Sequence, residues 1–153
     1  MSEQSENMFR GKTNTEHKIW VWGNLKIFEN GDTAISISGN HGMDLIERAA
    51  YISGFGTYSV FPSSVGRYTG MKDENGRKIF EGDLLNVYIG ISTYNGRVEY
   101  DNIIENFIIK IDEIKDINFE DITTMLAGLI GVEVVGNVFD NKLKEDKNDR
   151  QKT

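Results

Sequence analysis

Hydrophobic and polar residues alternate in several short segments of this chain, and that period of two is typical of β-strands. In residues 18–28, for example, Ile19 and Val21 alternate with Trp20 and Trp22. The same criterion predicts strands over residues 18–28, 33–38, 57–61, 77–91, 96–100, 106–112 and 132–139. The sequence therefore predicts a mainly β protein of the α+β class.

Two further patterns predict a hairpin and two helices. Asn30-Gly31, between residues 18–28 and 33–38, predicts a β-hairpin because this pair tolerates the positive φ of a tight turn. Asp44 and Glu47 form a capping box for a helix that ends before Gly54. A second helix is expected within residues 116–131, where apolar residues recur at helical spacing.

The order of these elements predicts two parts. Short strands with one helix inserted before the last strand favour a small SH3-like β-barrel. The expected divisions are a disordered segment at 1–7, an N-terminal hairpin and helix region at 8–56, the SH3-like barrel at 57–141 and a disordered tail at 142–153. Gly54 and Gly56 mark the expected boundary between the two parts.

Composition restricts the kinds of site and the cellular compartment that we expect for the protein. The 153 residues include no Cys, so disulfides and thiolate metal sites are excluded. The first residues contain no apolar stretch and no window approaches the length of a membrane span, so we expect a cytoplasmic protein without a membrane partner.

Charge bears on the possible partners. The net charge is −7, and residues 57–140 carry seven Lys and Arg against fourteen Asp and Glu. Nucleic-acid binding relies on clustered Lys and Arg that contact phosphates. The acidic field therefore disfavours a nucleic-acid partner and is typical of a soluble protein surface.

The sequence gives little support for a known catalytic motif. The two histidines, His17 and His41, lie in polar loops, no Ser occupies a nucleophile elbow, and the segment at Gly11 to Thr13 lacks the first glycine of a phosphate-binding loop. We therefore expect no enzymatic activity, no catalytic residue, no cofactor and no metal.

Residues 69–83, TGMKDENGRKIFEGD, gather four carboxylates: Asp73, Glu74, Glu81 and Asp83. Their spacing fails as an EF-hand loop, since alignment on Gly76 would place Met71 first and a glycine last. The spacing instead favours a type I turn from Asp73 to Gly76 with a bulge, followed by a second corner before Asp83. A weak cation site stays open as the alternative, because neighbouring carboxylates tolerate metals.

Three aromatic residues and one arginine form the candidate interaction surface: Trp20, Trp22, Tyr68 and Arg67. Trp, Tyr and Arg are enriched at the centres of protein interfaces, so this set favours a homo-oligomer or the binding of another protein. Two alternatives stay open. The aromatic side chains can instead serve core packing, or they can form a stacking platform for single-stranded nucleic acid, which the acidic field disfavours.

A long ordered motif adds a family resemblance. The segment YSVFPSSVGRYTGMKDENGRKIFEGDLLNV, with FRGK and WVWGNL before it and GRVEY and VVGNVFDN after it, resembles the YopX family of phage and prophage proteins over residues 8–143. Two positions depart from the family pattern: Arg67 replaces a usual Gln, and a Pro often found after Asn141 is missing.

This resemblance implies an SH3-like barrel in the C-terminal part and a phage or prophage origin, and it brings no established active site. Together with the residue patterns, it predicts a non-enzymatic accessory protein that acts by self-association or by binding a host or phage protein. The alternative is a nucleic-acid-associated factor in phage replication or regulation.

Overall fold

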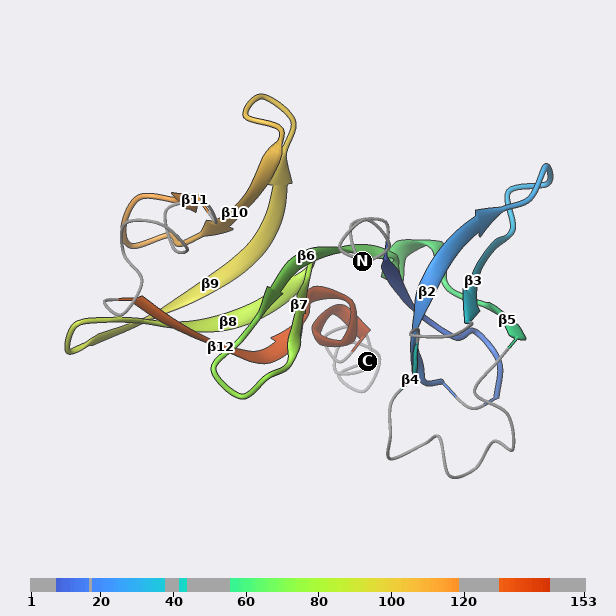
Figure 1. Cartoon of the computed structure of the whole chain (residues 1–153), viewed down its shortest axis with the longest axis horizontal. Coiled ribbons are helices and arrows are strands. Elements are labelled where there is room, and N and C mark those ends of the chain that lie inside the picture. Colours follow the sequence, from blue (N-terminus) through green and yellow to red (C-terminus); the bar gives the residue numbers. More distant parts are fainter. Residues whose placement is uncertain (1–7, 17, 38–41, 44–55, 119–129, 144–153) are drawn as a thin grey trace, which may run out of the picture. The chain divides into compact units, whose positions relative to one another are not determined.

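The computed structural model describes residues 8–16, 18–37, 42–43, 56–118 and 130–143, which form mainly antiparallel β-structure (Figure 1). The chain divides into two compact units, Met1–Tyr68 and Thr69–Thr153. The described strands form open sheets, and none of these sheets closes into a barrel. The mainly β prediction is thus confirmed.

The first unit is built on an antiparallel sheet. Its strands are β1 (Phe9–Lys12), β2 (Trp20–Ile27), β3 (Thr33–Ile37), β4 (Gly42–Met43), β5 (Gly56–Ser59) and the start of β6 (Gly66–Lys72). They are ordered β5-β3-β2-β1-β6, and β4 pairs with β2. A single 3-10 turn, η2 (Pro62–Ser64), precedes β6.

One face of this sheet carries the core of the first unit. The core consists of the buried residues Ile19, Val21, Ile35, Ile37 and Val60. Ile19 and Val21 occupy alternate positions, as the sequence pattern predicts for one face of a strand. Gly11 on β1 lacks a side chain for a steric reason, because a Cβ there would lie only 2.9–3.0 Å from the side chain of Val60.

The hairpin predicted around Asn30-Gly31 is present. Strands β2 and β3 pair in antiparallel register, and Gly31 has a φ of 90°. The Phe28 amide donates to the Asp32 carbonyl oxygen at 2.9 Å and closes the turn. The helix predicted from Asp44 lies outside the described residues.

Strand β5 joins the first unit. It pairs with β3, from Ala34 opposite Ser59 to Ile37 opposite Gly56. Sequence patterns assigned residues 57–61 to the barrel and placed the boundary at Gly56, whereas the two compact units divide after Tyr68.

The second unit contains one five-stranded sheet. Its strands are β8 (Asp83–Ile89), β9 (Ser92–Asp101), β10 (Asn106–Lys110), β11 (Ile117–Asn118) and β12 (Ile130–Asn137), in the order β11-β10-β9-β8-β12. Strand β7 (Lys78–Phe80) pairs with β6 and precedes β8 in the sequence. The four strands β8 to β11 form a meander, and β12 returns to pair with β8.

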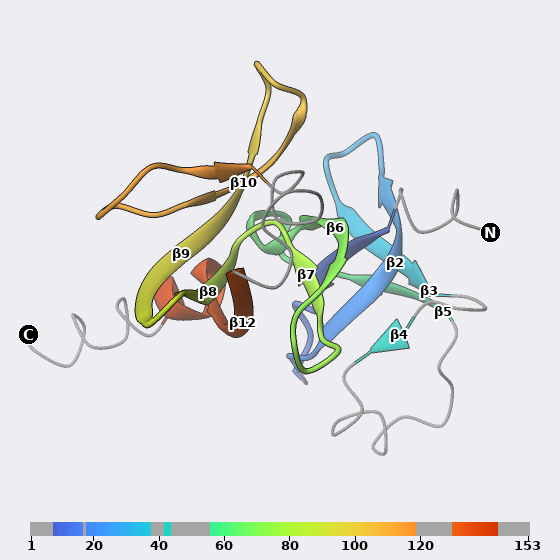
Figure 2. The ribbon, with the colours of Figure 1, turned by 60° about the vertical axis from the view of Figure 1, so that its left-hand side comes forward.

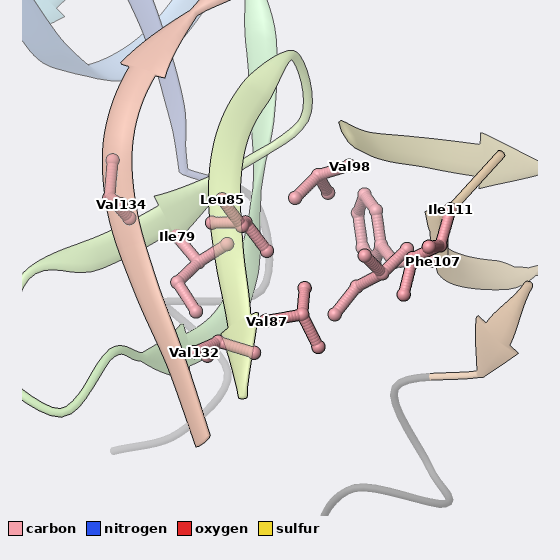
Figure 3. Close-up of a cluster of buried hydrophobic side chains, with 9 residues drawn as sticks. Ile79, Leu85, Val87, Val98, Phe107, Ile111, Val132 and Val134 are labelled. Carbon is pink, nitrogen blue, oxygen red and sulfur yellow. The ribbon is translucent and has the colours of Figure 1, made fainter. Parts of the chain in front are cut away.

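All but the shortest strand of this sheet contribute to one apolar core (Figure 3). The core consists of the buried residues Ile79, Leu85, Val87, Val98, Phe107, Ile109, Ile111, Val132 and Val134. On β8, Leu85 and Val87 are two positions apart, and on β12, Val132 and Val134 are also two positions apart. Each pair therefore lies on one face of its strand. The apolar residues that occupy alternate positions of these strands in the sequence therefore form this core.

The segment predicted as the inserted helix, residues 116–131, has β-strand structure near both ends. Ile117–Asn118 form β11 and Ile130–Gly131 begin β12, while residues 119–129 lie outside the described residues. Residues 138–143 form a helix that the sequence patterns did not predict. Asn137 caps it, because its Oδ1 accepts a hydrogen bond from the Asp140 amide at 2.8 Å. In the described part of the chain, no helix has the length and apolar character needed to cross a membrane.

Candidate functional site

The acidic stretch of residues 69–83 begins with a tight turn between β6 and β7. The Asp73 amide donates to the Arg77 carbonyl oxygen at 2.8 Å, and the Gly76 amide donates to the Asp73 carbonyl oxygen at 3.0 Å. Gly76 has a φ of 82°, the left-handed conformation that glycine adopts without steric cost. The predicted turn from Asp73 to Gly76 is therefore present, with Gly76 in the expected left-handed conformation.

The Asp73 carboxylate is the structural centre of this turn. Its Oδ1 accepts hydrogen bonds from the amides of Asn75 and Arg77, each at 2.9 Å. Its Oδ2 accepts a third hydrogen bond, from the amide of Val134 on β12, also at 2.9 Å. Asp73 is only 7% exposed, so these three donors satisfy a carboxylate that is largely removed from water.

Neighbouring residues extend this contact along β12. The Glu74 amide donates to the Val132 carbonyl oxygen at 3.2 Å, and the Arg77 guanidinium donates to the Val134 carbonyl oxygen at 3.3 Å. Strand β12 lies at the end of the sheet order, next to β8. The turn therefore covers polar backbone groups of an edge strand, which would otherwise offer a template for pairing with other chains.

Asp83 has a similar role at the second corner. Its side chain is 1% exposed, and its Oδ2 accepts a hydrogen bond from the Phe80 amide at 2.8 Å. The adjacent Gly82 has a φ of 92° and bonds in both directions, donating to the Val98 carbonyl and accepting from the Val138 amide. Asp83 and Gly82 thus join β7, β9 and the C-terminal helix.

These contacts give the acidic stretch a structural role. The buried carboxylates of Asp73 and Asp83 accept backbone amides and do not converge on a common point in the contacts described. Within the described ranges, no three Asp, Glu or His side chains come close enough to hold a metal ion. His17 and His41 lie outside those ranges.

The tryptophan face, defined here as Arg10, Lys12, Trp20 and Trp22, is the second candidate. In the pairing of β1 with β2, Arg10 lies opposite Trp22 and Lys12 lies opposite Trp20. Residues directly opposite each other in an antiparallel pair project from the same face. Two cations and two indoles therefore share the side of the sheet that faces away from the core residues Ile19 and Val21.

The cations of this face lie against an aromatic ring. The Arg10 guanidinium carbon is 4.6 Å from the centroid of the Trp20 ring, and the Lys12 ammonium is 5.5 Å from it. Each distance falls within the range of a cation–π interaction, worth about 0.5–2 kcal/mol depending on solvent exposure. All four side chains are half-buried, so they combine a fixed arrangement with remaining accessible surface.

The structure separates the four residues predicted as an interaction surface. Trp20 and Trp22 share a face, but Arg67 lies opposite Phe9 and so projects from the other face of the sheet. Tyr68 is 7% exposed, and this burial raises the pKa of its hydroxyl above the ordinary value. Only the two tryptophans therefore remain together as accessible members of the predicted set.

Arg10 and Lys12 were missed by the sequence patterns. They occupy alternate positions of β1, which is too short and too rich in charge and glycine to stand out as a strand. The alternation of Arg10 and Lys12 around Gly11 was the available signal. Only the register with β2 shows that these cations meet the tryptophans.

Comparison with known proteins gives one family match. A family model described as YopX protein matches residues 8–144, which include both the acidic turn and the tryptophan face. No curated protein matches the chain.

Proposed function

The chain belongs to the YopX family, and from this premise we propose that it is a phage- or prophage-encoded accessory protein that acts by binding proteins, without catalysis. The family match covers most of the chain and is consistent with the resemblance noted in the sequence. Binding to a second copy or to another protein both fall within this proposal.

The observation that carries this proposal is the tryptophan face. Trp and Arg are over-represented among the residues that supply most of the energy of protein interfaces. Here two tryptophans and an arginine lie side by side, held in place by the register of β1 and β2 and by the stacking of Arg10 on Trp20. Preorganised side chains lose less conformational entropy when a partner binds.

An SH3-like character of the second unit is part of the same proposal. In the order β11-β10-β9-β8-β12, strands β8 to β11 form a four-stranded meander, and β8 also pairs with β12. Small β-barrels are built from short antiparallel strands whose inward-facing side chains fill one core. The apolar core that draws on β8, β9, β10 and β12 supports this interpretation.

The test is a Trp22→Ala variant studied by light scattering and by capture of partners from a host lysate. We expect the wild-type protein to self-associate at tens of micromolar or to retain a specific protein, and the variant to lose affinity by about tenfold or more. Phe28→Ala is the matched control, because Phe28 is an exposed aromatic residue of the same unit at a hairpin end.

An unchanged Trp22→Ala variant would remove the tryptophan face from the proposal. A wild-type protein that stays monomeric and retains nothing specific would count against protein binding altogether.

A nucleic-acid role is the second candidate, and the tryptophan face is also the observation that favours it. Two cations beside two indoles resemble the stacking platforms that bind single strands. The net charge of −7 opposes it, and the cations that lie over the Trp20 ring compete with a stacking base. We expect no mobility shift of single or double strands at about 50 mM salt. A shift that Trp22→Ala abolishes would favour this second function instead.

A further inference from the structure

The hairpin between β9 and β10 ends in two exposed isoleucines. Ile103 is 92% exposed and Ile104 is 48% exposed. Figures 1 and 2 show this hairpin projecting from the rest of the second unit in both views. We call residues 101–105 the isoleucine tip. Hairpin ends are usually polar or glycine-rich, so two large apolar side chains at this position need an explanation.

The isoleucine tip is held in a defined conformation. The Asp101 carboxylate accepts hydrogen bonds from the amides of Ile103 at 2.8 Å and Ile104 at 3.3 Å. This carboxylate orders the turn and fixes the direction in which the isoleucines project. An ordered apolar side chain can enter a partner at a small entropic cost.

One residue of the isoleucine tip has a backbone conformation that is unfavourable for its residue type. Glu105 has a φ of 54°, and among the described residues it is the only one other than glycine with a positive φ. Glycine or asparagine would occupy this left-handed position with less strain. A left-handed position occupied by a glutamate beside exposed isoleucines points to a role for that charge.

Charge and apolar character point to a surface on this same chain that would receive the tip. Asp101 and Glu105 flank the isoleucines with negative charge, whereas the tryptophan face offers the Trp22 indole beside the cations Arg10 and Lys12, which lie over the Trp20 ring. Apolar side chains pack well on indoles, and opposite charges around an apolar contact favour one partner and one orientation.

We propose that the isoleucine tip of one copy binds the tryptophan face of a second copy. This inference rests on the proposed protein-binding function and specifies its partner. The contact joins two different surfaces, so each chain carries one tip and one face, and association either closes into a symmetric assembly or extends from copy to copy. In both cases the tip and the face contribute to every contact.

The first test is sedimentation velocity of the Ile103→Ser, Ile104→Ser double variant over a range of concentrations. We expect self-association to weaken by about tenfold or more, because two apolar anchors are removed. Ile91→Ser is the matched control, since Ile91 is fully exposed at the β8–β9 turn and lies outside the isoleucine tip. Association that is unchanged in the double variant, or lost equally in the control, overturns the proposal.

A mixing experiment tests the pairing of the two surfaces directly. The double serine variant keeps an intact tryptophan face, and Trp22→Ala keeps an intact tip. At a concentration at which each variant alone is monomeric, we expect an equimolar mixture to form one-to-one complexes through the single intact contact. A mixture that stays monomeric overturns the proposal.

The charged rim supplies an independent variant that leaves the isoleucines in place. Glu105→Lys reverses a charge on an exposed hairpin end, so we expect the fold to persist and self-association to weaken severalfold. The wild-type association should also weaken as salt rises, because rim charges are screened. Unchanged association in Glu105→Lys would overturn the proposed charge complementarity.

The outcomes of these experiments distinguish failure of this inference from failure of the proposed protein-binding function. Loss of association in Trp22→Ala with normal association in the tip variants leaves protein binding by the tryptophan face in place and overturns the tip as its partner. A wild-type protein that is monomeric at all concentrations overturns the self-association, while a specific partner captured through Trp22 would still support the proposed function.

Discussion

At the scale of single residues, Asp73 connects two distant parts of the chain. Its carboxylate orders its own turn through Asn75 and Arg77 and also binds Val134, which is 61 positions away in the sequence. The local bonds follow from the known preference of Asp for turns and were expected from the sequence. The bond to β12 depends on the folded sheet and could not be read from the local pattern.

Replacing Asp73 by Asn tests this connection. The amide oxygen can still accept from Asn75 and Arg77, but the amide nitrogen would face the Val134 amide and leave a buried donor unsatisfied. We expect a loss of about 2 kcal/mol in the free energy of unfolding, measured by urea denaturation, since an unsatisfied buried group costs about 1–3 kcal/mol.

Glu74→Gln is the control for this substitution. Glu74 is exposed and adjacent in sequence, so its change should alter the free energy of unfolding by less than about 0.5 kcal/mol. Equal effects of the two substitutions would show that the buried bonds of Asp73 are not what stabilises the turn.

At the scale of elements, Gly96 determines how β9 packs. It lies opposite Leu85 on β8, in the middle of the longest strand of the second unit. A Cβ at this position would be 2.5 Å from Ile109 and 3.0 Å from Val87, two core side chains. The strand therefore carries its glycine where the core leaves no room, which is a recurrent reason for glycine inside a strand.

Gly96→Ala should overpack this core. We expect a loss of about 1–3 kcal/mol in the free energy of unfolding, the usual cost of forcing an extra carbon into a packed interior. Gly136→Ala on β12 is the control, because its nearest neighbour would be 3.8 Å away and the backbone there is not left-handed. A Gly96→Ala variant as stable as Gly136→Ala would show that β9 can shift to admit the methyl group.

Strands with clear alternation were predictable from the sequence, and strands defined by pairing were not. Residues 18–28 and 33–38 contain β2 and β3, and the predicted strands 77–91 and 106–112 contain β8 and β10. The predicted strand 132–139 overlaps β12 but begins two residues late and includes the first two residues of the helix at 138–143. Strands β1 and β6 were missed, since glycine and charge interrupt their alternation and their pairing with each other specifies them.

The candidate site shows the same division. Trp20 and Trp22 were found because they alternate within one strand, but Arg67 could not be assigned to a face without the register of β6 with β1. Arg10 and Lys12 became part of the site only through the register of β1 with β2. Which residues share the site is therefore determined by the pairing between strands, and composition and periodicity do not specify that pairing.

At the scale of the whole molecule, each compact unit has its own apolar core. The first core is built around Val21 and Ile35, and the second around Leu85 and Ile109. Each core also borders a glycine on which a neighbouring side chain packs: Gly11 against Val60 in the first unit, and Gly96 against Ile109 in the second. The chain thus offers a matched pair of positions at which a single methyl group perturbs one core.

Hydrogen exchange of Gly11→Ala and Gly96→Ala tests whether the two cores are energetically separate. Opening free energies vary across a protein in cooperative units, and a substitution lowers protection in the unit that depends on it. We expect Gly11→Ala to lower amide protection mainly in β1–β3 and Gly96→Ala to lower it mainly in β8–β10. Equal loss of protection in both units, from either substitution, would instead show that the whole chain opens as one cooperative unit, and the separate cores would then be stable only together.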